Sequence, residues 1–210
     1  MYLSRVAIDS HNRKKVRDLT HLGAFHNWIE SSFPEEMTAN IRSRKLWRID
    51  KLKGKDYLLI VSDKKPDLDS LEKYGVPGSA ETKSYDKFLN AVEEGQLYRF
   101  RVTLNPVKSL SQGPGRRGRV VPEITAEQQL LFLESRADKL GFELVPGKYQ
   151  ILERCWVPFK KQGQKAIQLS KVTYEGLLSV ADKEVFYHTL TEGIGKKKAY
   201  GFGLMTVIPI

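Results

Sequence analysis

The chain has 210 residues, and its shares of hydrophobic (40%) and charged (29%) residues are those of a globular protein and exclude an intrinsically disordered one. It has no apolar run of about 20 residues and no signal-peptide core, which excludes a membrane span and predicts a cytoplasmic protein. The single cysteine excludes an internal disulfide, and the four histidines are too scattered for a metal site, so we predict no metal or other cofactor. The net charge of +10 favours a polyanionic partner over a surface that is basic without function.

The first half of the chain predicts a β-α-β-β-α-β order, which is the ferredoxin-like pattern. Alternating polarity and helical spacing locate the elements, and proline and glycine mark several of their ends. The predicted strands are residues 2–8, 46–49, 57–61 and 85–89, and the predicted helices are residues 17–33 and 66–74.

The second half predicts the same order. Its predicted strands are residues 96–104, 150–159, 167–180 and 203–208, and its predicted helices are residues 125–140 and 182–191. A capping box formed by Thr125 and Gln128 opens the first of these helices. We therefore predict an α+β fold of two tandem ferredoxin-like domains, residues 1–94 and 95–210, with a cleft between them that suits an extended ligand.

Two basic segments stand out before the C-terminal region. One is the loop 111–119, which glycine and proline keep out of regular structure, and the other is the tip of the second predicted hairpin. Their cations are Arg116, Arg117 and Arg119 in the loop, and Lys160, Lys161 and Lys165 at the tip. Arginine forks pair well with phosphate, and a lysine-rich tip can reach a nucleic acid. The alternatives are a solvated loop and a sheet edge that lysines protect from aggregation.

A glycine-rich loop precedes the last predicted strand. Its glycines are Gly193, Gly195, Gly201 and Gly203, and the residues between them include Lys196, Lys197, Lys198 and Tyr200. The first two glycines follow a helix and can supply its left-handed cap, and the last two let a backbone or a phosphate come close. The spacing matches neither a Walker A loop nor a dinucleotide-binding fingerprint.

Four segments resemble the CRISPR repeat endoribonucleases, in particular the CasE (Cse-type) subunit of type I-E systems. The loop has that family's spacing of glycine–apolar–glycine, five residues, and glycine–apolar–glycine. The opening Met1–Val6 and the strands Phe100–Lys108 and Tyr174–Leu178 are similar to further segments of the family. The resemblance therefore spans both halves of the chain.

The resemblance implies a metal-independent endoribonuclease. Such an enzyme binds the stem-loop of CRISPR repeat RNA and cuts the precursor once in each repeat, at the base of the stem. The 2′-hydroxyl upstream of the scissile phosphate attacks it, which leaves a 2′,3′-cyclic phosphate and a 5′-hydroxyl. The resemblance also implies that the enzyme keeps the guide RNA and joins other protein subunits in the Cascade complex, and we expect the free protein to be a monomer.

The catalytic histidine of the family maps to His26. The pair Phe33-Pro34, seven and eight residues downstream, anchors that alignment. A histidine suits the role because its ordinary pKa of about 6.5 lets it exchange a proton near neutral pH. Its helical spacing from Leu22 and Ile29 leaves another interpretation open, in which His26 is a histidine at the edge of the core.

Two positions depart from the family pattern. Members often carry a tyrosine three residues before the histidine, where this chain has Gly23. Either that phenol is not replaced, or His21 or Tyr200 supplies its role. Thr103 stands where the family has an arginine, so one basic contact is missing or moved.

These residues lead to a hypothesis for the reaction. His26 acts as general base on the 2′-hydroxyl or as general acid on the leaving 5′-oxygen, and one histidine cannot do both in one step. The basic residues named above, together with Lys108, hold the RNA. The glycine-rich loop, across the cleft from His26, either supports the site or packs between the halves. The alternatives to an enzyme are a non-catalytic repeat-RNA-binding subunit and a structural subunit that binds protein.

Overall fold

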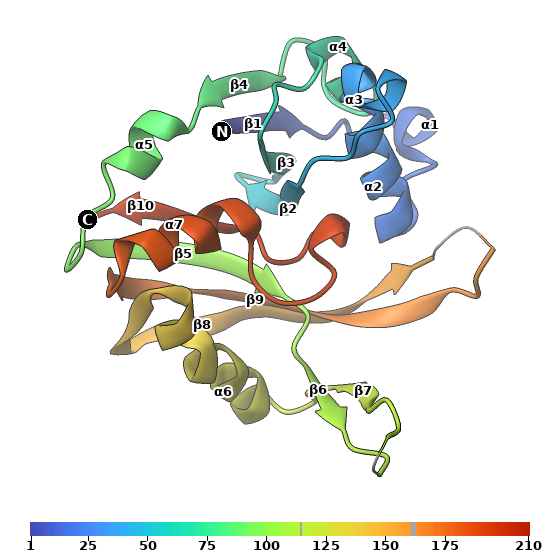
Figure 1. The fold of residues 1–210 in the computed structure, drawn as a ribbon. Coiled ribbons are helices and arrows are strands. Elements are labelled where there is room, and N and C mark those ends of the chain that lie inside the picture. Colours follow the sequence, from blue (N-terminus) through green and yellow to red (C-terminus); the bar gives the residue numbers. More distant parts are fainter. Residues whose placement is uncertain (114, 161–162) are drawn as a thin grey trace.

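The computed structural model describes residues 1–113, 115–160 and 163–210 and contains two four-stranded antiparallel sheets (Figure 1). Lys161, one of the predicted RNA contacts, lies outside the described residues. The strands of the first sheet are β1 (Tyr2–Ala7), β2 (Lys45–Leu52), β3 (Lys55–Ser62) and β4 (Glu81–Ser84). Their order is β2-β3-β1-β4, so the first strand of the unit lies inside the sheet.

The hairpin between β2 and β3 closes through a two-residue turn. Lys53 and Gly54 have φ angles of +49° and +76°, and Leu52 pairs with Lys55 across the turn. Two positive φ angles in succession give the turn a twist that matches the twist of the strands, and glycine at the second position makes this possible without strain there. The turn therefore fixes the register of β2, the strand that meets the second half of the molecule.

Short helices connect the strands of the first half. They are α1 (Arg13–Val16), α2 (Leu22–Ser31), α3 (Pro34–Thr38), α4 (Leu68–Leu71) and α5 (Asp86–Asn90). The helix predicted over residues 17–33 begins only at Leu22, because the imidazole of His21 accepts a hydrogen bond from the backbone N–H of Ala24 (3.2 Å) and caps the helix there. Pro34 ends α2 and opens α3, where its fixed φ and missing N–H are tolerated.

The prediction of a strand at residues 85–89 is wrong. The fourth strand lies just before it, as β4, and Asp86–Asn90 form α5. Phe88 and Leu89 both pack on the core that the two halves share, whereas neighbouring residues of a strand would point to opposite faces. Phe88 stacks on Tyr85 with ring centroids 5.3 Å apart.

The second sheet repeats the order of the first. Its strands are β5 (Leu97–Leu104), β8 (Phe142–Phe159), β9 (Ile167–Val180) and β10 (Met205–Pro209), in the order β10-β5-β9-β8. The helices α6 (Ala126–Ala137) and α7 (Lys183–Glu192) are the two predicted ones. The prediction of two tandem ferredoxin-like units is thus confirmed, while the domain boundary after Glu94 stays a prediction. Strand β8 is longer than predicted and bulges between Leu144 and Tyr149, which hid its first part in the sequence.

A small hairpin flanks the segment predicted as an irregular arginine loop. Strands β6 (Val107–Leu110) and β7 (Arg119–Pro122) pair with each other and form a sheet of their own. Arg119 belongs to β7, so that part of the prediction is wrong, whereas Arg116 and Arg117 lie in the connecting turn. The hairpin and the long β8–β9 arm project from the second sheet (Figure 1).

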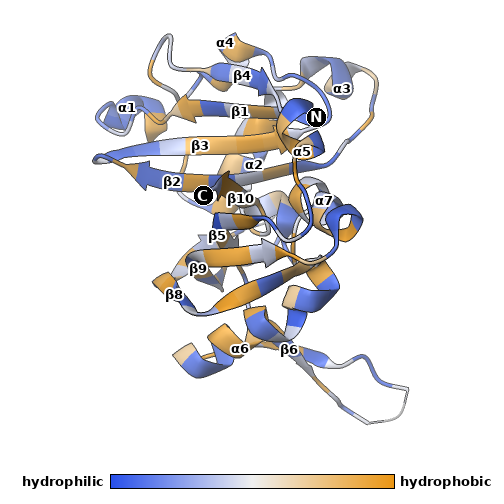
Figure 2. Ribbon diagram, turned by 90° about the vertical axis from the view of Figure 1, so that its left-hand side faces the viewer, coloured by the Kyte–Doolittle hydropathy of each residue, from blue (hydrophilic) through white to orange (hydrophobic). Residues whose placement is uncertain are grey.

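The two sheets meet at their edge strands, β2 and β10, so that the eight strands follow one another from β4 to β8 in Figure 2. Arg48 on β2 is 1% exposed and donates to the carbonyls of Arg101 (2.6 Å) and Leu204 (2.9 Å). It also donates to Thr206 Oγ1 (2.7 Å) and pairs with Asp50 (2.6 Å). Every nitrogen of the buried guanidinium therefore has a hydrogen-bond acceptor, and the two halves pack against each other as one body.

Buried side chains fill two main clusters. One is centred on Trp28, Ile29 and Leu58 of the first half, and the larger one joins the second half to β2 through Leu46. Among the described residues, no helix is long and apolar enough to cross a membrane.

Candidate active site

Helix α2 presents His26 at its surface. Trp28 and Ile29 point into the first core and are at most 2% exposed, and the indole of Trp28 donates to the carbonyl of Leu71 (3.1 Å). These contacts fix the rotation of the helix about its axis, because neighbouring residues on a helix point in different directions. The side chain of His26 is 21% exposed, so it is neither a core residue nor a freely solvated one.

The glycine-rich loop lies against His26 rather than across a cleft from it. The imidazole is 5.0 Å from the ring of Tyr200 between centroids, and the backbone of Ala199 accepts a hydrogen bond from it. The same carbonyl accepts a hydrogen bond from the indole of Trp47 on β2 (2.9 Å). Tyr200 also packs edge-on against Phe159 of the arm, with centroids 4.5 Å apart. The second half therefore supplies one wall of the His26 site.

Glycine is required at three positions of this loop by close packing. A Cβ on Gly193 would meet the Leu46 side chain at 2.6 Å, and one on Gly201 would meet the Trp47 ring at 2.8 Å. A Cβ on Gly203 would overlap the carbonyl of Ile194. All three have positive φ, but Gly193 combines φ +76° with ψ 169°, so the left-handed cap predicted there is wrong. The loop thus packs between the halves and also contacts His26.

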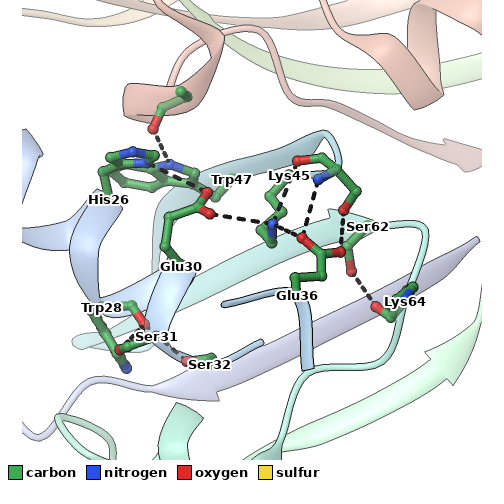
Figure 3. Close-up of polar contacts among 12 residues, drawn as sticks. His26, Trp28, Glu30, Ser31, Ser32, Glu36, Lys45, Trp47, Ser62 and Lys64 are labelled. Carbon is green, nitrogen blue, oxygen red and sulfur yellow. Dashed lines mark hydrogen bonds and ion pairs between the residues drawn. The ribbon is translucent and has the colours of Figure 1, made fainter. Parts of the chain in front are cut away.

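A chain of charges runs inward from His26 (Figure 3). Nδ1 of His26 is 3.8 Å from Oε1 of Glu30, one helical turn further along α2. The other oxygen of Glu30 is 3.4 Å from Nζ of Lys45, which is 2.6 Å from Glu36. The side chains of Lys45 and Glu36 are only 2% and 3% exposed, so this pair forms a fixed support for Glu30.

Burial is the main influence on the pKa of His26 and lowers it below the ordinary value. Glu30 and the hydrogen bond to Ala199 raise the pKa, while the positive charges of Arg42 and Lys45 lower it, and the net shift is downward. The imidazole is therefore neutral at pH 7, and a neutral imidazole can accept a proton. Burial also raises the pKa of Glu36, but its hydrogen bonds to Lys45 and Ser43 outweigh this and hold that pKa below the usual range.

His26 opens onto a groove of about 620 Å³. The lining comes from α2, from the segment around α3 and from Tyr200, and Arg42 forms part of the rim. Glu30, Arg42 and Lys45 belong to this site but were not predicted from the sequence. The spacing of four residues between His26 and Glu30 could have revealed Glu30. No local sequence signal indicates that Lys45, on β2, lies behind helix α2.

The structure explains the glycine at position 23. A Cβ on Gly23 would overlap the backbone carbonyl of Lys160, because the β8–β9 arm packs against the start of α2. A tyrosine cannot occupy this position unless the arm moves. His21 is held as the helix cap and lines a separate cavity of about 220 Å³ between the halves. Tyr200 lines both this cavity and the His26 groove, so of the two replacements that the sequence left open only Tyr200 contacts His26.

The predicted RNA contacts fall into separate places. Lys197 lies over the ring of Phe159 (4.4 Å), and Lys198 is partly buried, which lowers its pKa together with the nearby charge of Arg44. Lys196 belongs to the same loop, and Lys160 and Lys165 flank the tip of the arm. Lys108 on β6 pairs with Glu123 (2.9 Å), and the β6–β7 hairpin with its arginines lies on the far side of the second sheet from α2 (Figure 1). The hairpin is therefore not part of the His26 site.

No group of three histidine, cysteine, aspartate or glutamate side chains in the described parts of the chain could hold a metal ion. The reaction's independence of metal stays a prediction.

Comparison with known proteins identifies the family. A family model described as "CRISPR associated protein" matches residues 1–209. The chain belongs to this CRISPR-associated family. A relative named CRISPR-associated endoribonuclease Cse3, from Thermus thermophilus, is 30% identical over the full length of both chains. This confirms the resemblance to the Cse-type subunit.

Solved structures of relatives agree in fold with this CRISPR-associated protein. One of Cse3 bound to a 19-nucleotide RNA is 29% identical, covers all of both chains and has a TM-score of 0.79. Another, of Thermus thermophilus Cse3 with an RNA representing a pre-cleavage complex, is 28% identical, covers 99% and 98% of the two chains and has a TM-score of 0.81.

Proposed function

We propose that this protein is an endoribonuclease that processes CRISPR repeat RNA and that His26 is its catalytic residue. The observation that carries the proposal is the position of His26, whose partly buried imidazole borders an open groove and is held between Glu30 and the glycine-rich loop. The names of the relatives, an endoribonuclease and its RNA complexes, support the same function.

The reaction follows from the protonation state of His26. Its lowered pKa leaves the imidazole neutral at pH 7, so His26 acts as general base and takes the proton from the 2′-hydroxyl. The 2′-oxygen then forms a bond to phosphorus, and the bond from phosphorus to the 5′-oxygen breaks. The products are a 2′,3′-cyclic phosphate and a 5′-oxygen that takes a proton from water to become a hydroxyl, and His26 then returns its proton to the solvent. In this proposal no metal takes part.

The second half supplies most of the RNA-binding surface in this proposal. The arm and the β6–β7 hairpin place positive charge on two projections of that half, and the lysines of the glycine-rich loop add positive charge beside the His26 site. An A-form stem has a deep and narrow major groove, so contacts to its shape and backbone dominate. Retention of the guide RNA, assembly with other Cascade subunits and a cytoplasmic location stay predictions.

The direct test uses His26→Ala on a repeat hairpin in EDTA. We expect cleavage by the variant to be lost or greatly slowed, because the general base contributes about 10²- to 10⁴-fold, while the Kd for the hairpin stays nearly unchanged. A wild-type protein that binds the hairpin but does not cut it would favour the non-catalytic subunit. Cleavage by the variant at the wild-type rate would show that His26 is not the catalytic residue.

A further inference from the structure

Two arginines that were not predicted as site residues lie at the His26 groove. Arg42 and Arg44 precede β2, and both are exposed. Arg42 lines the groove together with His26 and Tyr200, and both arginines line an adjoining hollow of about 300 Å³ that reaches Ala199. Within the described ranges, no carboxylate forms an ion pair with either arginine.

The backbone between these arginines is held from behind. Ser43 donates from its N–H to Oε2 of Glu36 (3.1 Å) and from its hydroxyl to Oε1 (2.5 Å). Glu36 is buried and is itself fixed by Lys45. A segment fixed in this way presents its two guanidinium groups without having to order itself when a ligand arrives, which lowers the entropic cost of binding.

The cations around the groove also favour an anion, because the carboxylates that share its lining, Glu30 and Glu36, are already paired with Lys45. The positive charge of Arg42 is one of the influences that lower the pKa of His26, and that of Arg44 lowers the pKa of Lys198. Such shifts mean that the cations lie close enough to repel one another. An anion in the groove relieves this repulsion, and arginine binds phosphate oxygens with two parallel hydrogen bonds.

We propose that Arg42 and Arg44 bind adjacent phosphates of the RNA at the cleavage site, with Arg42 on the scissile phosphate. Cα atoms two residues apart are at most about 7 Å apart, which is the scale of the step between neighbouring phosphates. Arg42 lines the same groove as His26 and so stabilises the negative charge that grows on the phosphate during attack. Arg44, beside Lys198, holds the neighbouring phosphate in place. This inference rests on the proposed catalytic role of His26.

The test compares Arg42→Gln and Arg44→Gln with Lys83→Gln. Lys83 is an exposed residue on β4, at the opposite edge of the first sheet, so its variant loses the same charge far from the groove. Cleavage of a repeat hairpin is followed in a single turnover at saturating protein, and the Kd is measured at several salt concentrations with an uncleavable 2′-deoxy hairpin. Thermal unfolding checks that each variant is folded.

Arg42→Gln is expected to slow cleavage at saturation by about 10²-fold, as for other removed donors to a developing negative charge. Arg42→Lys, which keeps the charge and loses the fork, should lie between that variant and the wild type. Arg44→Gln should raise the Kd and reduce the salt slope of log K by about 0.7 to 0.9, the value for a single phosphate interaction. Lys83→Gln should change neither quantity.

The inference is overturned if Arg42→Gln or Arg44→Gln behaves like Lys83→Gln while His26→Ala abolishes cleavage. In that case the catalytic role of His26 stands and the phosphate is held by other groups. If His26→Ala cleaves normally, the proposed function fails first, and the arginine variants still report whether phosphates bind at this groove.

Discussion

The two halves of the molecule share a strand order but differ in what they add to it. The first half fills its connections with short helices and contributes His26, Glu30 and the buried Lys45–Glu36 pair. The second half instead adds the β6–β7 hairpin, the long β8–β9 arm and the glycine-rich loop. The arm and the hairpin of the second half carry cations on projections, whereas Lys45 of the first half is buried and paired with Glu36.

This difference indicates a division of labour between chemistry and binding. A proton transfer needs an imidazole held within hydrogen-bond reach of its target, and the first half provides a rigid support for it. A folded RNA needs contacts spread over a large surface, and the second half extends outward to provide them. The glycine-rich loop joins the two functions, because it packs on β2 and contacts His26 from the second half.

The largest effect is expected from a substitution that breaks the junction between the halves. Arg48→Met removes a buried cation and leaves Asp50 and two carbonyls without their partner. We expect the free energy of unfolding to fall by about 3 to 5 kcal/mol. Urea unfolding measures this, and Arg5→Gln, which removes an exposed pair with Glu81, is the control and should cost less than about 1 kcal/mol. Equal losses in the two variants would mean that Arg48 does not hold the junction.

The second prediction separates binding from chemistry. Replacing Arg116, Arg117 and Arg119 with Gln should weaken hairpin binding and lower the salt slope of log K by about 0.7 to 0.9 for each arginine that binds a phosphate in the wild type. The single-turnover rate at saturating protein should stay near the wild-type value, because this hairpin is not part of the His26 site. A rate that falls at saturation while the Kd stays the same would contradict the division of labour.

The third prediction concerns the loop that joins the halves. Gly201→Ala places a Cβ 2.8 Å from the Trp47 ring at φ +84°, whereas Gly195→Ala has a similar φ of +77° and open space around it. Both variants lose about 1 kcal/mol or more to backbone strain, but only Gly201→Ala should also displace the loop and slow cleavage. Thermal unfolding and the saturating cleavage rate distinguish them, and identical behaviour would mean that the Trp47 contact is unimportant.

The smallest effect is expected from a substitution that tests the role of Glu30. Its negative charge raises the pKa of His26, so Glu30→Gln should lower that pKa further and move the acidic limb of the cleavage rate to lower pH. Glu35→Gln, on the exposed side of α3, is the matched control and should leave the profile unchanged. A limb that moves to higher pH, or that does not move, would show that Glu30 does not act on the catalytic group.

Much of the fold could be predicted from the sequence because its signals are local. The alternation in β5 and the capping box of α6 were sufficient for their elements, and the repeated order of elements predicted both units. The errors arose where tertiary contacts decide the structure. Residues 86–90 form a helix because the neighbours Phe88 and Leu89 both pack on the shared core, and the bulge in β8 interrupts the alternation that would have marked its start.

The candidate site was predictable only in part. His26 and the glycine-rich loop were found through a resemblance, yet their contact depends on the packing of the loop against β2. Arg42, Arg44 and Lys45 carry no sequence signal of their own, because their placement depends on Glu36, a buried carboxylate on α3. From the sequence, Gly23 could be interpreted only as a missing tyrosine, because the carbonyl of Lys160 that lies beside it comes from a distant part of the chain.

The central claim is that a neutral His26 in this groove removes the proton from the RNA. The most direct test measures the pH dependence of the second-order cleavage rate constant at subsaturating protein and titrates the His26 ring protons of the free protein by NMR. We expect a single midpoint in both measurements, below the ordinary histidine pKa of about 6.5, with a rate that rises as the pH increases through it. A rate that falls as the pH rises through the His26 midpoint, or a His26 that titrates at or above the ordinary value, would contradict the claim.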